Sequence, residues 1–273
     1  MVEQGLALGR VGATAYCRAG SGPALVLVHG VGLNQGFWAP QIADFAATHE
    51  VVAFDTLGHG GSPPPPEPAA LGDYARQIRE LMDGLGLGRA AIVGHSMGAL
   101  VALEFALAHP ERVAAVIAMN AVYCRSPAQR AAVAARAAAL EGANTEGWRQ
   151  AAIERWFGAP VPAGQMETAV WVGAALAAAD PLGYGRAYRL FARADAAHAG
   201  RLGALAMPVL FLTGALDPNS APEMSRRMAA EAANGRAVVL PGARHMMSLT
   251  APATVNQVLR AFLESAAARA PAG

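Results

Sequence analysis

The chain has 273 residues and a formal net charge of +1 at pH 7. This length suffices for one large domain, or for a domain that carries an insertion. The balanced charge offers no electrostatic basis for binding nucleic acid or an anionic membrane, so neither is expected as a partner.

Cysteine usage and the first residues indicate where the protein works. Cys17 and Cys124 are the two cysteines, and no His/Cys spacing typical of a metal site surrounds them. The first residues lack a charged segment followed by an apolar core, so we expect no signal peptide. Residues 19–43 are uncharged, but polar residues, glycines and prolines interrupt them, so they do not predict a membrane span. We therefore expect a cytoplasmic protein.

Short apolar runs alternate with segments of helical spacing along most of the chain. Such runs are typical of strands buried on both faces of a parallel sheet, and the segments between them predict helices that cover it. Strands are predicted at residues 11–18 (an edge strand), 24–28, 51–55, 90–93, 113–119, 209–214 and 238–240. Helices are predicted at residues 40–47, 74–87, 97–109, 222–233 and 250–268.

The alternation stops between about residues 123 and 205, where the chain is Ala-rich and mainly helical in pattern. This segment holds three of the four tryptophans and no clear strand. We therefore predict an α/β fold with a mostly parallel, doubly wound sheet. Its core comprises residues 1–122 and 206–273, and residues 123–205 form an inserted helical cap.

Residues 94–98 read Gly-His-Ser-Met-Gly between a predicted strand and a predicted helix. A serine at such a turn takes a strained backbone conformation that exposes its hydroxyl at the top of the sheet. Gly94 and Gly98 lack a Cβ, so strand and helix can approach closely there. The pattern predicts that Ser96 is a nucleophile. The alternative is an ordinary strand-to-helix turn with a capping serine.

A serine nucleophile needs a base within hydrogen-bond reach, and the base needs an acid that orients it. In open parallel sheets such groups lie beyond the carboxyl ends of the strands. Asp217 follows the strand at 209–214, and His245 follows the last strand. We predict that Asp217 orients the imidazole and that His245 is the general base and then the general acid. Taken alone, Asp217 and His245 could each be an ordinary loop residue, but the position of both after strands favours a catalytic role.

Acyl transfer also needs backbone N–H groups that stabilise the developing oxyanion. Met97, which follows the nucleophile, is predicted to supply one, and Val31 in the glycine-rich loop after residue 28 the other. The alternative for that loop is simply a tight turn. We expect His29 and His59 to hold the glycine loops by hydrogen bonds, and His95 to pack against the sheet.

Several segments together resemble the α/β-hydrolase superfamily along nearly the whole chain: residues 29–32, 55–62, 94–98, 214–217 and 242–245. The resemblance is to the branch of small bacterial esterases, enol-lactonases and ring-cleavage-product hydrolases. It implies a hydrolase with a helical cap and with no metal or organic cofactor. Relatives that attack through a carboxylate carry Asp where this chain has Ser96. Asn120 excludes relatives that take their catalytic acid from that position, which favours Asp217.

The first hypothesis for the reaction is hydrolysis of a small carboxylic ester or lactone through an acyl-Ser96 intermediate. The resemblance suggests an enol-lactone of aromatic catabolism. The alternative is hydrolysis of a C–C or amide bond in a ring-opened catabolite by the same three residues. A ligand sensor that kept the fold is disfavoured, because binding alone needs no strained serine.

The cap is expected to set specificity for a small-molecule substrate, while the oligomeric state stays open. An inward-facing arginine could clamp a substrate carboxylate, although most cap arginines are expected on solvated helix faces. The arginines considered are Arg125, Arg130, Arg136, Arg149, Arg155, Arg186, Arg189 and Arg193. The aromatic residues considered for an apolar lining are Trp148, Trp156, Phe157, Trp171, Tyr184 and Tyr188.

Overall fold

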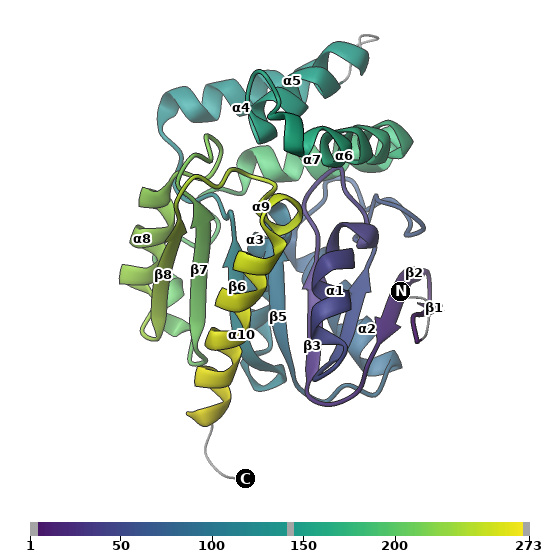
Figure 1. The fold of residues 1–273 in the computed structure, drawn as a ribbon, viewed down its shortest axis with the longest axis vertical. Helices are drawn as coiled ribbons and strands as arrows, with labels where there is room; N and C mark the ends of the chain where they lie inside the picture. The colour runs from purple at the N-terminus through teal and green to yellow at the C-terminus, as the bar shows by residue number, and fades with distance from the viewer. Residues whose placement is uncertain (1–4, 141–144, 270–273) are drawn as a thin grey trace.

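A computed structural model describes residues 5–140 and 145–269 of the chain. Its centre is an eight-stranded sheet with the strand order β1-β2-β4-β3-β5-β6-β7-β8 (Figure 1). The strands are β1 (Ala7–Val11), β2 (Thr14–Ala19), β3 (Ala24–Val28), β4 (Glu50–Phe54), β5 (Ala90–His95), β6 (Val113–Met119), β7 (Val209–Gly214) and β8 (Gly235–Leu240). β2 pairs antiparallel with β1 and β4, and the strands from β4 to β8 pair in parallel.

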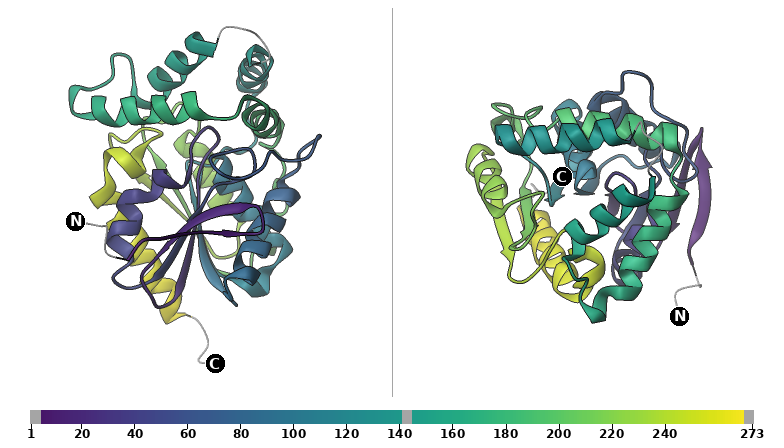
Figure 2. Two further views of the ribbon diagram at one scale, coloured as in Figure 1. Left: turned by 90° about the vertical axis from the view of Figure 1, so that its right-hand side faces the viewer. Right: turned by 90° about the horizontal axis from the view of Figure 1, so that it is seen from above.

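Helices cover both faces of this sheet, as Figures 1 and 2 show. They are α1 (Ala39–Phe45), α2 (Leu71–Gly84), α3 (Met97–Ala108), α8 (Pro222–Glu231), α9 (Met247–Thr250) and α10 (Pro252–Ala268). α1 and α10 lie together on one face, whereas α2 and α3 pack against each other on the opposite face. This confirms the doubly wound α/β fold. Among the described residues, no helix combines the length and apolar character that crossing a membrane requires.

The central strands are apolar along their length because both of their faces are covered. All residues of β5 and β7 are buried, and β3 and β4 each expose only their first residue in part. Strands in such surroundings read as continuous hydrophobic runs rather than as alternating ones. Because β5, β7 and β8 run parallel, their carboxyl ends meet at one edge of the sheet.

A helical region between β6 and β7 covers that edge (Figure 1). Its helices are α4 (Pro127–Ala139), α5 (Thr145–Phe157), α6 (Met166–Ala178) and α7 (Pro181–Arg193). This confirms that a helical segment interrupts the α/β alternation, while the domain boundaries at residues 123 and 205 stay a prediction. Arginines of α7 attach this cap to the loop after β4: Arg186 donates to the Pro65 carbonyl at 2.8 Å, and Arg193 donates to the Ala69 carbonyl at 2.7 Å.

The prediction of one edge strand at residues 11–18 is wrong. The structure has a hairpin there, in which β1 and β2 are joined by a turn at Gly12 and Ala13. Gly12 has φ +53°, a conformation that glycine adopts at little cost. β1 could not be predicted from the sequence because this strand lies at the sheet edge, is mostly exposed and therefore has no apolar run.

The turn between β5 and α3 depends on two glycines. A Cβ at Gly98 would overlap the backbone carbonyl oxygen atoms of Val28 and His29, and a Cβ at Gly94 would overlap the carbonyl of Gly98. These contacts confirm the expectation that strand and helix approach closely at this motif. The first turn of α3 thus lies directly against the end of β3.

We expect Gly98→Ala to lower the free energy of unfolding by about 1–3 kcal/mol, because the added methyl group must displace backbone rather than a side chain. Gly72→Ala is the matched control. Gly72 lies in the first turn of α2 with open space where a Cβ would lie, so this change should stabilise the protein by about 0.4–1 kcal/mol. Urea denaturation of both variants measures the two effects. Equal effects of the two substitutions would contradict the close approach.

Candidate active site

Ser96 occupies the turn between β5 and α3 in a conformation that non-glycine residues rarely adopt. Its φ is 56° and its ψ is −116°. The Ser96 N–H donates to the Met119 carbonyl at 2.8 Å, which ties the turn to the end of β6. Residues in such sparsely populated regions persist only where the surrounding structure imposes them, and they cluster at functional sites. The expected strain at Ser96 is therefore present.

Asp217 and His245 come together beyond the carboxyl ends of β7 and β8. The Nδ1 atom of His245 lies 2.7 Å from Oδ2 of Asp217, and both side chains are buried. A carboxylate can only accept, so Nδ1 carries the proton and donates it to this bond. The other ring nitrogen, Nε2, makes no contact with Asp217 and is the atom that can accept a proton from a nucleophile.

Further donors hold the Asp217 carboxylate in its charged form. Asn120 Nδ2 donates to Oδ2 at 2.7 Å, and the Asn219 N–H donates to Oδ1 at 2.8 Å. Burial by itself raises the pKa of Asp217, but His245 and these two donors outweigh it, so the pKa lies below its ordinary value. Asp217 is therefore an anion at neutral pH and can orient the imidazole.

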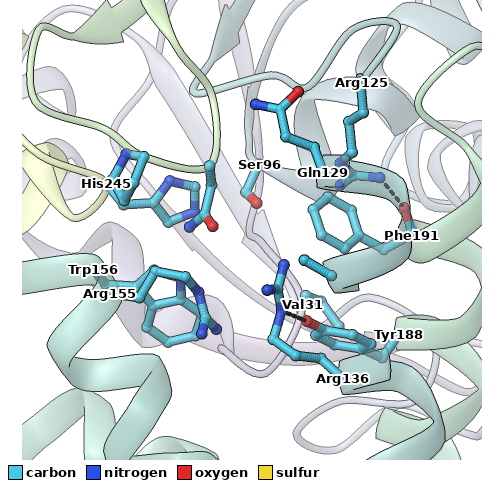
Figure 3. Close-up of a pocket in the computed structure, with 13 residues that line it drawn as sticks. Val31, Ser96, Arg125, Gln129, Arg136, Arg155, Trp156, Tyr188, Phe191 and His245 are labelled. Atoms are coloured by element: carbon cyan, nitrogen blue, oxygen red, sulfur yellow. Dashed lines mark hydrogen bonds between the residues drawn. The ribbon is translucent and has the colours of Figure 1, made fainter. Parts of the chain in front are cut away.

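Ser96 and His245 line the same cavity, beneath the cap (Figure 3). Within residues 5–140 and 145–269, no hydrogen bond joins the Ser96 hydroxyl to the His245 ring. Such bonds are often long in ligand-free enzymes and tighten when substrate binds. Trp156 of α5 stacks on the imidazole with ring centroids 5.9 Å apart, so the cap shields one face of the ring from water.

The two backbone donors predicted from the sequence both belong to residues near Ser96. Val31 lines the cavity beside Ser96, and its N–H makes no hydrogen bond to the rest of the described chain. Met97 is the first residue of α3, and the N–H of such a residue has no partner within its own helix. These are the N–H groups predicted for an oxyanion hole, and that role stays a prediction.

His29 and His59 hold the loop that carries Val31. His59 Nε2 accepts from the Gly32 N–H at 2.9 Å, and His29 Nε2 accepts from the Thr56 N–H at 3.0 Å. In both rings Nδ1 faces a backbone carbonyl and must therefore donate. The two rings are neutral and buried, which confirms the structural role expected of them.

Sequence reasoning missed the contact that His95 makes. It is buried, as expected, but its Nε2 also donates to the backbone carbonyl of His245 at 2.9 Å. Its ring lies 4.9 Å from the His245 ring and 4.7 Å from that of Phe37. A histidine next to a serine in the chain gives no sign that it contacts a loop 150 residues away, so local pattern could not reveal it.

The cavity above Ser96 has a volume of about 150 Å³ and a positive wall. Arg125, Arg136 and Arg155 of the cap reach it, so three of the arginines considered from the sequence face inward. Figure 3 shows the Arg136 side chain extending from its helix toward Ser96. Of the aromatic residues considered, Trp156 and Tyr188 line the cavity. In the described part of the chain, no group of three or more His, Cys, Asp or Glu side chains is arranged to hold a metal ion.

A family model for the α/β hydrolase family matches residues 25–258. The chain is also 36% identical over 267 residues to the (E)-2-((N-methylformamido)methylene)succinate hydrolase of Acinetobacter baylyi. That match covers 97% of this chain and 99% of the relative.

Solved structures of hydrolases have the same fold. The enol-lactonase from Burkholderia xenovorans superposes with a TM-score of 0.85 at 25% identity, covering 94% of this chain and all of that chain. A thermophilic esterase from Thermogutta terrifontis, solved with malate bound, superposes with a TM-score of 0.83 at 25% identity, covering 96% of this chain and 98% of that chain.

The buried histidines predict loss of stability in acid. Burial lowers the pKa of His29 to about 4, and those of His59 and His95 to about 3, from an ordinary value of 6.5. The unfolded chain therefore binds more protons than the folded chain below pH 6.5. We expect the free energy of unfolding to fall as the pH drops from 6.5 to about 4, by up to ~1.4 kcal/mol per pH unit for each histidine.

Urea denaturation of the wild type and of His59→Gln at pH 5, 6 and 7 measures this dependence. Glutamine does not titrate and can still accept from the Gly32 N–H, so the variant should show a shallower decline toward acid. A wild-type stability that is unchanged between pH 7 and pH 5 would contradict the neutral state of the three rings.

Proposed function

The chain belongs to the α/β-hydrolase family, and from this premise we propose that it hydrolyses a small carboxylic ester or lactone through an acyl-Ser96 intermediate. One observation carries the proposal. The Asp217–His245 hydrogen bond of 2.7 Å lies beside the cavity that holds the strained Ser96. A buried anion that orients an imidazole beside a serine at a sharp turn is the arrangement that nucleophilic acyl transfer needs.

Acylation begins when the Ser96 hydroxyl oxygen attacks the substrate carbonyl carbon. Nε2 of His245 takes the hydroxyl proton, and the carbonyl oxygen becomes an oxyanion that accepts from the Val31 and Met97 N–H groups. The tetrahedral intermediate then collapses. The bond to the leaving oxygen breaks, and His245 returns the proton to that oxygen, which leaves an ester on Ser96.

Deacylation repeats the same steps with water as the nucleophile. His245 takes a proton from water as the oxygen attacks the acyl carbon, and the proton then returns to the Ser96 oxygen as the acid departs. Asp217 stays ionised throughout and stabilises the imidazolium that forms in each half of the cycle. The low pKa of Asp217 supports this role.

The substrate is proposed to be a small carboxylate-bearing molecule. The cavity is small and its wall includes three arginines. The Acinetobacter baylyi relative is named for a succinate, and the Thermogutta terrifontis esterase was solved with malate. The enol-lactonase likeness supports a lactone among the candidate substrates.

A second candidate reaction is hydrolysis of an amide bond by the same residues. It is favoured by the 36% identical relative, whose name includes an N-methylformamido group. Rates on three substrate types decide between the candidates: an aryl ester, an enol-lactone and an N-acyl enamine of succinate. Turnover of the amide at a kcat/KM well above that of the ester and the lactone would favour the second candidate.

The nucleophile is tested with p-nitrophenyl acetate. We expect the wild type to release p-nitrophenolate, with mass spectrometry showing an acetyl group on Ser96. Ser96→Ala should lose at least ~10⁴-fold in kcat, because the variant lacks the hydroxyl oxygen that attacks the substrate carbonyl. Ser21→Ala, at an exposed position before β3 and outside the cavity, is the control and should keep wild-type turnover. Full turnover by Ser96→Ala would overturn the acyl-enzyme proposal.

The orienting acid is tested by Asp217→Asn. An amide at this position cannot stabilise the imidazolium and favours the wrong tautomer, so kcat should fall by ~10³–10⁴-fold. Asp217→Glu, which keeps the charge, should retain more of the activity. Circular dichroism and the urea midpoint confirm that each variant is folded. A kcat for Asp217→Asn within about threefold of wild type would exclude Asp217 from the reaction.

A further inference from the structure

The guanidinium groups that face the cavity differ in the ion pairs and hydrogen bonds that the protein offers them. Arg125 is buried and pairs with Asp195 at 3.7 Å. It also donates to the carbonyls of Phe191 and Ala192, and its charge lies 4.5 Å from the centre of the Phe191 ring. The protein thus neutralises and holds this arginine, which leaves it little capacity for a ligand.

Arg136 of α4 has no such counter-charge. Its Nε donates to the Tyr188 hydroxyl at 3.2 Å, and among the described residues no carboxylate lies within 4.0 Å of its guanidinium. With Nε occupied, the two terminal nitrogens remain as a fork that matches a carboxylate in a bidentate manner. The contact with Tyr188 fixes the direction of this fork into the cavity (Figure 3).

Arg155 of α5 faces the same space from the opposite helix. It donates to the Ala151 carbonyl of its own helix at 3.2 Å, and it too lacks a carboxylate partner in the described part of the chain. Burial, followed by the positive charge of Arg136, lowers the pKa of Arg155. A guanidinium does not lose its proton in a protein, so the two half-buried cations repel each other, and an anion between them would offset this repulsion.

We propose that Arg136 and Arg155 together bind a free carboxylate of the substrate, so that the natural substrate is a half-ester, lactone or half-amide of a dicarboxylic acid. The inference rests on the proposed function for the scissile bond, which lies at Ser96. The second carboxyl group of the same acid lies between α4 and α5, and Arg125 supports the cavity without contacting that group.

The anion site is tested first without catalysis. Isothermal titration of the wild-type chain with succinate, and with neutral succinamide, measures binding. We expect succinate to bind and succinamide not to bind measurably. Arg136→Gln and Arg155→Gln should each weaken succinate binding by about tenfold or more, as loss of a charge-assisted hydrogen bond implies. Arg149→Gln, which removes the same charge from α5 outside the cavity, should leave binding unchanged.

Kinetics then test specificity. The ratio of kcat/KM for p-nitrophenyl hemisuccinate to that for p-nitrophenyl butyrate should fall at least tenfold in Arg136→Gln and Arg155→Gln, mainly through KM. Arg149→Gln should keep the wild-type ratio, so the fall is specific to the two arginines that face the cavity. This outcome separates the arginines from the acyl-transfer residues, whose loss would lower both rates.

Three results would overturn the inference: no succinate binding to the wild type, binding that both cavity variants retain, or an equal loss in Arg149→Gln. Binding of succinate that depends on both arginines supports the anion site even if the chain turns over no ester. The reverse result, ester turnover without succinate binding, supports the proposed function and rejects this substrate class.

Discussion

The close backbone contact between α3 and the end of β3 is the constraint on which the site depends. Gly98 lies so near the Val28 and His29 carbonyls that no side chain fits there. The helix therefore starts at a sharp turn, and Ser96 is held at a φ of 56°. The same contact places the start of the loop after β3 against the first turn of α3, and a Cβ at Gly30 of this loop would lie 3.1 Å from the Ser96 Cβ. One steric requirement thus brings the glycine-rich loop next to the serine.

Much of this architecture could be predicted from the chain because it depends on local patterns. The buried runs at residues 24–28 and 113–119 match β3 and β6, since strands covered on both faces have to be apolar throughout. Ser96, Asp217 and His245 each follow a strand, and parallel strands bring such positions to one edge. The exposed strand β1 was missed because edge strands carry no such run.

Contacts between distant segments could not be predicted. Nothing near His95 in the chain indicates that its ring donates to the His245 carbonyl, and nothing near Asn120 indicates that its amide donates to Asp217. From the sequence, Asn120 is only a residue that cannot act as the catalytic acid. In the structure Asn120 has a role at the site, because its side-chain amide donates to Asp217 and helps to keep that carboxylate charged. Such polar contacts depend on side-chain direction, which the pattern of apolar residues does not encode.

The difference among the cap arginines likewise depends on contacts that the sequence does not reveal. Composition marks many cationic residues in the cap, and periodicity alone places most of them on solvated faces. Arg125 and Arg136 both reach the cavity, yet Asp195 neutralises only the first. Two like charges that face one small space repel each other, a cost in stability that proteins carry at functional sites. A carboxylate between them removes the repulsion and adds directed hydrogen bonds. Neither Arg136 nor Arg155 has a carboxylate partner within residues 5–140 and 145–269, and a ligand explains this better than folding does.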